Sequence, residues 1–359
     1  MGIIEKKFTR QVYEAIYEAE PQQHGMRLDQ FVMLYLGGFS REQIKNKIKD
    51  GEIQIVGRPG KQRPNSTVHY RDQVIMKIHR TIHEDEYWNG EKIDIEVDPE
   101  IVFEDDDLIV ISKPPYMTTH PTGKHLFYCA TVHFENIHNK TIHSLHRLDR
   151  ETSGILMLGK SPKASATITD HFENDRVRKC YFLIGIKNSD YKGLKHFTAK
   201  ERLGGEDEGQ RRVMIEAFPE DSDLGKSAET EFEILYEENQ YVLALAFPKT
   251  GRQHQIRVHA QVHGFPLLGD KLYFGGYPMF QRFKDLLATE EDHVLMQIPR
   301  QALHAVAINL PYKGEQTTFI CHLPHDLKDW IRKNLKIEIN KLEEIVSKEI
   351  KNYFNSFSK

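Results

Sequence analysis

Residues 146–160 read HRLDRETSGILMLGK and contain more information about the fold than any other part of the chain. In the first half of this segment, Asp149 lies between Arg147 and Arg150. The second half contains an uninterrupted apolar run, residues 155–158, which is typical of a buried strand. Because nearby cations lower the pKa of a carboxyl group, we expect Asp149 to be ionised at neutral pH and held rigidly by the strand that follows.

Asp149 permits two interpretations when the segment is considered by itself. An ionised and rigid carboxylate can attack a sugar carbon or stabilise an oxocarbenium-like centre. An Arg-Leu-Asp-Arg sequence can equally form a structural ion pair that closes a loop. The residues of this one segment do not decide between the two.

The whole segment resembles the HRLD-x-x-TSG signature of the RluA-type pseudouridine synthases, which isomerise uridine to pseudouridine within RNA. Three further segments resemble motifs of this family and occur in the family's order: KCYFLIGI at 179–186, GRQHQIRVHAQVHGFPLLGDKLY at 251–273 and RQALHAVAINLP at 300–311. The resemblance implies an isomerase that needs no cofactor, with a catalytic domain over residues 101–325. It also implies that Asp149 is the catalytic residue.

The same resemblance implies roles for five residues that would contact the substrate. Arg257 would form an ion pair with the catalytic aspartate, and Arg147 would enter the RNA stack in place of the extracted uridine. Tyr181 would pack on the flipped ring, while Arg252 and His254 would lie near RNA phosphates. On a helix, positions 254 and 257 share one face, which fits their assignment to one site.

The net charge of −4 conceals a strong division of charge along the chain. Residues 24–80 contain eleven basic and five acidic residues, a net charge of +6. Residues 81–110 contain twelve acidic residues and a single lysine, a net charge of −11. Such asymmetry predicts a basic module that contacts a polyanion, followed by an acidic linker.

The basic module resembles the S4 RNA-binding domain in the segments RLDQFV, FSREQIKNKIKDGEIQI and DQVIMKI. Ser40 and Gln43 form a capping-box pattern at the start of a helix, and Gly51 is well placed to end that helix. Three places depart from the family patterns. Arg71 and Tyr116 stand where glycine is usual, and residues 56–60 replace the usual Asn-Gly turn. We expect the loop around Tyr116, near the proposed pocket, to differ in geometry.

The predicted fold class is α+β: a mixed, mostly antiparallel sheet of the pseudouridine synthase type, preceded by a small α+β S4-like domain. Strands are expected at 108–112, 155–159, 181–186, 230–235 and 242–247, and helices at 162–174 and 254–263. The predicted domains are an extension at 1–23 with weak helical amphipathicity, an S4-like domain at 24–80, an acidic linker at 81–100, the catalytic domain at 101–325 and a helical tail at 326–359. For the tail, packing on the core and a role as an interaction helix both remain open.

The composition favours a cytoplasmic protein. No apolar run approaches the roughly 18 residues that a membrane span needs, and the first residues lack the apolar core of a signal peptide. The three cysteines are far apart and odd in number, which indicates reduced thiols. The spacing of His254, His259 and His263 does not hold three ligands on one helix face, so we expect no metal site. We expect a monomer that binds RNA and no membrane.

These observations predict an RNA pseudouridine synthase that acts on structured RNA. The S4-like segment favours large-subunit ribosomal RNA over transfer RNA as the substrate. The alternatives are a catalytically silent RNA-binding or ribosome-assembly factor of the same fold and, less favoured, a metal-dependent hydrolase. Whether Asp149 attacks C1′ or removes a sugar proton stays open at this point.

Overall fold

A computed structural model describes residues 3–9, 11–36, 39–80, 84–121, 125–205 and 213–356. The chain divides into two compact units, each of which is formed from two separate segments. Unit 1 contains Met1–Glu86 and Met117–Ser144, and unit 2 contains Tyr87–Tyr116 and Leu145–Lys359. The chain therefore leaves unit 1, contributes a segment to unit 2, returns to unit 1 and then completes unit 2.

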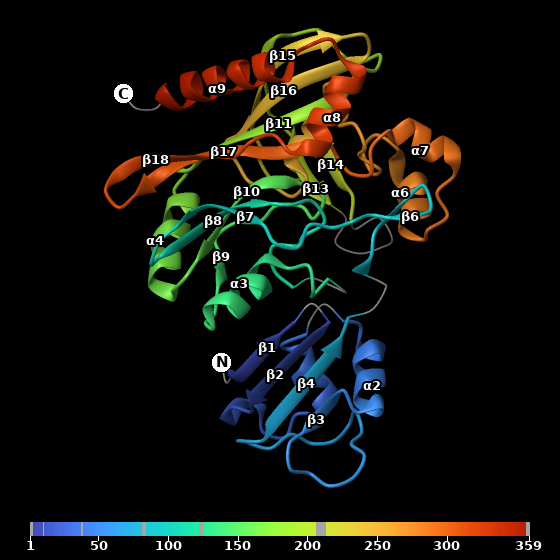
Figure 1. Ribbon diagram of the computed structural model, residues 1–359, viewed down its shortest axis with the longest axis vertical. Helices are drawn as coiled ribbons and strands as arrows, with labels where there is room; N and C mark the ends of the chain where they lie inside the picture. The colour runs from blue at the N-terminus through green and yellow to red at the C-terminus, as the bar shows by residue number, and fades with distance from the viewer. Residues whose placement is uncertain are drawn as a thin grey trace. The chain divides into compact units, whose positions relative to one another are not determined.

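Unit 1 contains a four-stranded antiparallel sheet in the order β1-β2-β4-β3 (Figure 1). Its elements are β1 (Ile3–Phe8), β2 (Val12–Glu18), η1 (Pro21–Gln23), α1 (Leu28–Met33), α2 (Arg41–Asp50), β3 (Ile53–Ile55), β4 (Gln73–His79), α3 (Ala130–His138) and β9 (His143–Ser144). The buried side chains of α1, α2 and the sheet form one hydrophobic cluster, which Leu126, Phe127, Cys129 and Val132 of the returning segment complete.

Ile3–Phe8 and Val12–Glu18 form strands, so the helical amphipathicity predicted for residues 1–23 is wrong over these segments. Tyr13, Ala15 and Tyr17 of β2 are buried at every second position, which is the period of a strand and not of a helix. Strand β2 pairs with β4 along its whole length. The structure thus differs from the predicted division of the chain, in which 1–23 was a separate extension; Met1, Gly2, Arg10 and residues 81–83 lie outside the described residues.

The predicted helix after Ser40 is confirmed together with both of its ends. Ser40 accepts a hydrogen bond from the backbone of Gln43, and the Gln43 side chain accepts one from the backbone of Ser40. Gly51 ends the helix in the left-handed conformation, with a φ of 81°. Ile44 and Ile48 lie on the buried face, as their spacing predicts.

Unit 2 is built on a large sheet whose strands follow the order β12-β15-β16-β11-β17-β10-β8-β7, with β18 paired to β17 (Figure 1). Its strands are β5 (Tyr87–Trp88), β6 (Glu91–Lys92), β7 (Glu100–Glu104), β8 (Leu108–Lys113), β10 (Ser153–Gly159), β11 (Arg178–Ile186), β12 (His196–Ala199), β13 (Arg202–Gly205), β14 (Ile215–Phe218), β15 (Thr230–Glu238), β16 (Tyr241–Pro248), β17 (Leu303–Tyr312) and β18 (Glu315–Ile320). Its helices are α4 (Pro162–Glu173), α5 (Gln255–Val262), α6 (Gly276–Lys284), α7 (Glu290–Met296), α8 (His325–Asn334) and α9 (Ile339–Asn355).

The predicted α+β class and the mostly antiparallel pairing are confirmed. Within this large sheet, β10 and β17 pair in parallel, whereas the pairs β7–β8, β8–β10, β11–β16, β11–β17, β12–β15, β15–β16 and β17–β18 are antiparallel. All five predicted strands are present, each with slightly longer bounds, as β8, β10, β11, β15 and β16. Helix α4 begins as predicted, because Ser161 caps it and Pro162 occupies its first position.

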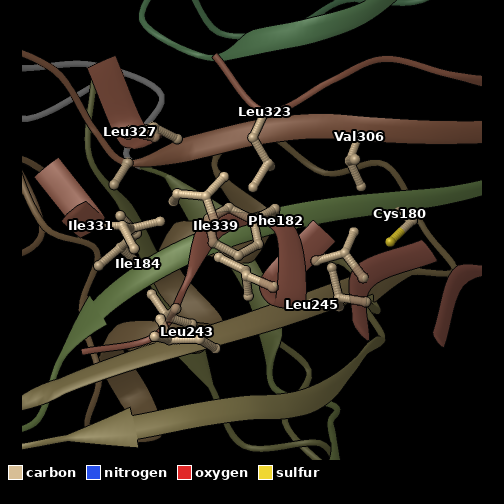
Figure 2. Close-up of a cluster of buried hydrophobic side chains, with 14 of the residues drawn as sticks. Cys180, Phe182, Ile184, Leu243, Leu245, Val306, Leu323, Leu327, Ile331 and Ile339 are labelled. Atoms are coloured by element: carbon tan, nitrogen blue, oxygen red, sulfur yellow. The ribbon is translucent and has the colours of Figure 1, made fainter. Parts of the chain in front are cut away.

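The C-terminal helices belong to the core of unit 2. Helices α8 and α9 cover one face of β16, β11 and β17 (Figure 1). Figure 2 shows Leu327, Ile331 and Ile339 grouped with Phe182 and Leu243 of the sheet. Of the two roles left open for this tail, the structure therefore supports core packing.

Two non-glycine residues adopt the left-handed conformation at the positions where the family patterns usually have glycine. The φ of Arg71 is 67° and the φ of Tyr116 is 68°. Glycine adopts this conformation most easily, so both loops retain the backbone geometry that glycine favours in spite of the larger residue. Among the helices of the described residues, none combines the length and apolar composition that crossing a bilayer requires.

The packing of α9 leads to a stability prediction. Leu342 is fully buried, and Lys341 beside it is exposed. Leu342→Ala should lower the free energy of unfolding by about 2–5 kcal/mol, because truncation removes apolar contacts and leaves a cavity. Lys341→Ala should change it by less than about 0.5 kcal/mol. Urea titration of both variants tests this, and equal midpoints would show that α9 does not pack on the core.

Candidate active site

Asp149 lies in a loop that leads directly into β10. The loop closes with a hydrogen bond of 3.0 Å from the backbone of Thr152 to the carbonyl of Asp149. Gly154 then pairs in parallel with Ala305 of β17, and a Cβ on Gly154 would lie 2.2 Å from the Ala305 carbonyl oxygen. Glycine at this position therefore allows the two strands to approach, and their pairing fixes where the Asp149 loop starts.

The Asp149 carboxylate contacts a cation from a distant part of the chain. Arg257 of α5 donates from Nη1 to Oδ2 of Asp149 at 3.0 Å, so the ion pair predicted from the family resemblance is present. Arg147, two residues before Asp149 in the sequence, has an exposed side chain. The Asp149 side chain keeps 32% of its surface accessible, whereas Arg257 keeps 9%. The carboxylate is therefore anchored on one side and open on the other.

A second carboxylate holds Arg257 from behind. Asp270 is fully buried and accepts hydrogen bonds from Nε and Nη2 of Arg257 at 2.7 and 2.9 Å. Asp270 also accepts two backbone hydrogen bonds, from Leu272 and Tyr273, each of 3.0 Å. Bidentate pairing of this kind fixes the plane of a guanidinium. Asp270 thus directs the remaining Nη1 donor of Arg257 toward Asp149.

These contacts determine the charge of Asp149. Burial alone raises the pKa of its carboxyl group, but His254 and Arg257 outweigh this effect, and the pKa lies below its ordinary value of 3.8. The pKa of His254 is itself lowered to about 4, because burial and Arg257 disfavour the charged imidazole. His254 is therefore neutral at pH 7, and Arg257 is the cation that keeps Asp149 ionised.

His254 lies beside the carboxylate at the start of α5. Its Nε2 is 3.8 Å from Oδ2 of Asp149, and its Nδ1 is 2.9 Å from the hydroxyl oxygen of Tyr273. The ring of Tyr273 also covers the guanidinium of Arg257, with 4.9 Å between Cζ and the ring centroid. The family resemblance predicted that His254 lies near RNA phosphates; the structure places it next to the carboxylate of Asp149.

A group of polar residues supports the Asp149 loop from the β17 side. Gln301 donates to the Thr152 hydroxyl at 2.7 Å and reaches Oδ2 of Asp149 at 3.4 Å. The carboxylate of Glu151 instead binds Lys271 at 2.8 Å and accepts from the backbone of Gln301. Asp149 and Glu151 therefore share Gln301 but pair with different cations, Arg257 and Lys271. Only Asp149 belongs to the Arg257 cluster, which consists of Arg257, Asp149 and Asp270.

The remaining predicted site residues, Tyr181, Arg147 and Arg252, differ in how exposed they are. Tyr181 of β11 is partly buried, and burial together with the nearby charge of Asp149 raises the pKa of its phenol, so it is protonated at neutral pH. Arg147 is exposed, and within the described chain it makes no hydrogen bond or ion pair. Arg252 is exposed and donates from Nε to the carbonyl of Ser227 at 2.9 Å.

Sequence reasoning missed three members of the site: Asp270, Tyr273 and Gln301. A signal for the first two was present, because Asp270 follows the apolar segment 265–268 and a buried carboxylate requires a partner. Tyr273 lies three residues further on. Gln301 has no comparable signal, because a glutamine beside a strand is more often a surface residue.

The histidines that the sequence placed near His254 have structural partners. His259 is buried, and its ring nitrogens lie 2.9 Å from the Thr230 hydroxyl and 3.1 Å from the Glu201 carbonyl. His263 pairs with the Glu201 carboxylate at 3.1 Å. Across the part of the chain that the structure describes, no group of three or more His, Cys, Asp or Glu side chains has the arrangement of a metal site.

Comparison with known proteins gives a consistent picture. Residues 107–262 match the family model described as RNA pseudouridylate synthase. A ribosomal large subunit pseudouridine synthase D of Pseudomonas aeruginosa is 28% identical over 311 residues, which cover 84% of this chain and 90% of that protein. An uncharacterized RNA pseudouridine synthase of Chlorobaculum parvum is 30% identical over 319 residues, which cover 84% of this chain and 92% of that protein.

Among solved structures, human RNA pseudouridylate synthase domain containing 4 has a similar fold. The TM-score is 0.52 at 21% sequence identity, over 65% of this chain and 92% of that chain. At this level of identity the similarity establishes the fold, which is that of the pseudouridine synthases.

The Arg257 cluster leads to a prediction for stability. Arg257→Met leaves the buried Asp270 without a cation, and the free energy of unfolding should fall by about 3–5 kcal/mol at pH 7. Arg252→Met, in an exposed residue of the same segment, should change it by less than about 0.5 kcal/mol. Chemical denaturation of both variants at pH 7 measures the difference.

The pH dependence of this difference follows from the two carboxylates. The pKa values of Asp149 and Asp270 are both lowered in the folded protein, so their contribution to stability is present above the ordinary value of 3.8 and is lost as the pH falls through the lowered values. The gap between wild type and Arg257→Met should therefore narrow as the pH falls from 7 to 3, because protonation removes the carboxylate charges that Arg257 stabilises. A gap that is constant from pH 7 to pH 3 would contradict the proposed ion pairs.

Proposed function

The chain belongs to the RluA-type family of RNA pseudouridine synthases, and we propose that Asp149 is the catalytic residue with which it isomerises uridines of large-subunit ribosomal RNA. The family makes the protein an isomerase with an RNA substrate. The identity of the catalytic residue and of the RNA are the parts of the proposal that experiments must test.

One observation carries the assignment of Asp149: its carboxylate is ionised, fixed on one side by Arg257 and accessible on the other. A nucleophile or base needs these properties together, because it must be charged, oriented and within reach of the substrate. In a purely structural ion pair there is no need for an open face. The second carboxylate behind Arg257 supports the same conclusion, since it orients the cation without contact to solvent.

The proposed reaction requires a single carboxylate. The C1′–N1 bond of uridine breaks, the uracil ring rotates, and C1′ joins C5; the proton on C5 is then lost while N1 gains one. Two first steps are open to ionised Asp149: attack on C1′, which forms a glycosyl ester as uracil leaves with the bonding electrons, or removal of a ribose proton. Both steps need the carboxylate in its charged form, which Arg257 maintains.

Access to C1′ requires that the uridine leave the RNA stack. Extraction of a base costs a few kcal/mol, which a side chain that fills the vacated space can partly offset. We assign this role to Arg147, because its guanidinium is exposed and lies two residues from Asp149. A protonated Tyr181 beside Asp149 would pack on the extracted ring, and exposed Arg252 would contact a phosphate.

Unit 1 offers a surface suited to the RNA backbone, as the S4-like pattern of residues 24–80 predicts. Arg41, Lys45 and Lys49 occur at every fourth position of α2 and therefore form one stripe. Next to this stripe, the buried carboxylate of Asp29 binds Arg41 at 3.2 Å and Arg27 at 2.9 Å. Both guanidinium groups are about half exposed, so they are fixed and still accessible to phosphates.

Ribosomal RNA of the large subunit is the favoured substrate because several relatives, including the Pseudomonas aeruginosa protein, are named for it and align over most of their length. Transfer RNA is the alternative. Comparison of pseudouridine positions in ribosomal and transfer RNA from cells with and without this gene distinguishes the two. Loss of pseudouridines from transfer RNA alone would overturn the ribosomal assignment.

The role of Asp149 leads to the first functional prediction. Asp149→Asn should reduce isomerisation below detection in a tritium-release assay, because it keeps the shape of the side chain and removes its charge. The affinity for RNA should stay within a few-fold of wild type, since the variant retains the residues proposed to bind RNA.

The matched control is Asp190→Asn, which makes the same change at an exposed position of unit 2. It should retain full activity. Substantial turnover by Asp149→Asn would rule out the proposed catalytic role, and a large loss of RNA affinity would assign Asp149 to binding instead.

The basic stripe leads to a second functional prediction. The combined change Arg41→Gln, Lys45→Gln and Lys49→Gln should weaken RNA binding and reduce the slope of log affinity against log salt by roughly two, because each lost phosphate contact releases one counterion fewer. The turnover rate at saturating RNA should change much less, since the proposed reacting groups lie in unit 2.

Three exposed lysines of α8 and α9 provide the control: Lys333, Lys341 and Lys348, each changed to glutamine. This variant removes the same charge from unit 2, and its salt dependence should equal that of wild type. If both triple variants have the wild-type slope, α2 is not part of an RNA-binding surface.

A further inference from the structure

His254 has a backbone conformation that histidine rarely adopts. It precedes α5 with φ 55° and ψ 15°, in the left-handed region. L-amino acids with a Cβ are strained there, and such residues persist where the surrounding structure holds them for a reason. The imidazole does not cap the helix, so helix capping does not explain its presence.

Hydrogen bonds define which ring nitrogen of His254 carries the proton. The backbone N–H of Ile215 donates to the hydroxyl oxygen of Tyr273 at 2.9 Å. The Tyr273 hydroxyl lies 2.9 Å from Nδ1 of His254, and since its oxygen already accepts from Ile215, we infer that it donates its own proton to that nitrogen. Nδ1 is therefore an acceptor without a proton, and in the neutral ring the proton is on Nε2.

The Nε2 atom of His254 is the ring nitrogen on the side of Asp149. Nε2 lies 3.8 Å from Oδ2 of Asp149, which is too far for a hydrogen bond. Within the described part of the chain, Nε2 has no hydrogen-bond acceptor in reach. The His254 side chain retains 14% exposure, so a bound group can approach the N–H.

The charges around His254 favour the neutral ring. Arg257 is on the same helix, Asp149 is on the loop before β10, and Asp270 and Tyr273 belong to the segment after α5. Arg257 opposes protonation, whereas both carboxylates favour it, but each of them is already bound to Arg257. A second proton on Nδ1 would also break the hydrogen bond from Tyr273.

We propose that His254 is a catalytic residue that donates its Nε2–H hydrogen bond to the O2 carbonyl oxygen of the extracted uracil, and that Tyr273 fixes the required tautomer. This inference rests on the proposed role of Asp149. If C1′ is within reach of Asp149, O2 of the same nucleotide lies only three bonds from C1′ and can come within reach of Nε2. Cleavage of the C1′–N1 bond places its electron pair on uracil, and the negative charge spreads onto N1, O2 and O4.

A fixed neutral donor suits this step. A donor directed at an atom that gains charge lowers the barrier more than it strengthens substrate binding, because the hydrogen bond becomes stronger during the reaction. A neutral imidazole does so without transferring its proton, which leaves the uracil free to rotate and react at C5. Nothing is oxidised or reduced, and the proton stays on His254.

The tautomer can be tested without any substrate. Two-bond ¹H–¹⁵N spectra of the full-length protein, labelled at histidine, should show the pattern of a neutral Nε2–H ring for His254, assigned by its loss in His254→Asn. Tyr273→Phe should change this pattern to a mixture of the two neutral tautomers. A Nδ1–H or doubly protonated ring in the wild type at pH 7 would overturn the proposal.

The catalytic role is tested by single-turnover rates. His254→Asn should lower the rate roughly 100-fold and leave RNA affinity within a few-fold, because the lost hydrogen bond matters mainly in the transition state. Asparagine tolerates the left-handed conformation, so the fold should be retained. His263→Asn, at the other end of α5, is the matched control and should have the wild-type rate. Equal rates for His254→Asn and wild type would overturn the proposal.

A substrate analogue tests whether O2 of uracil is the atom that accepts the hydrogen bond from His254. Transcripts of large-subunit ribosomal RNA are made with uridine or with 2-thiouridine, and nucleoside chromatography measures the product. Sulfur at position 2 is a weak acceptor, so His254→Asn should slow the reaction much less on the thio transcript than on the normal one. The same 100-fold effect on both would exclude O2 as the partner. If the wild type converts neither transcript, large-subunit ribosomal RNA is not the substrate. The ¹H–¹⁵N spectra still test the tautomer of His254 in that case, because they need no substrate.

Discussion

The structure around Asp149 depends on one guanidinium that serves two carboxylates. Arg257 donates from Nε and Nη2 to buried Asp270 and from Nη1 to Asp149. Because Asp270 also accepts two backbone hydrogen bonds, its position is fixed by the fold and does not depend on a substrate. The charge and orientation of Asp149 follow from this arrangement, since burial by itself would favour its neutral form.

The sheet of unit 2 brings the members of this cluster together. Asp149 precedes β10, and Gln301, which supports its loop, precedes β17; these two strands pair in parallel at Gly154 and Ala305. Arg257 comes from the helix after β16 and Asp270 from the loop beyond that helix. Gly269, with a φ of 73°, allows this loop to approach the Arg300 carbonyl, where a Cβ would lie 2.0 Å from the oxygen. Close backbone contacts therefore determine the geometry of the charged groups.

Unit 1 is formed from two segments that are separated in the sequence by a part of unit 2. Unit 1 is completed by Met117–Ser144, whose apolar residues Leu126, Phe127 and Val132 join its core. Removal of the first 80 residues would therefore expose an apolar surface on the remaining chain. For this reason, substitutions on α2 are a cleaner probe of RNA binding than truncation, because they change charge and leave the core intact.

Sequence alone determined the fold class, the main strands of unit 2, the capped helix at Ser40 and the pair of Asp149 with Arg257. These depend on local patterns of apolar residues, on capping residues and on ordered motifs that resemble one family. Tertiary structure decided the rest. Val12–Glu18 form a strand because β4 offers an edge that pairs with β2, and the tail packs on the core because the sheet offers an apolar face. Asp270, Tyr273 and Gln301 join the site through contacts between residues distant in sequence, and His254 lies beside Asp149 because Tyr273 holds its ring there.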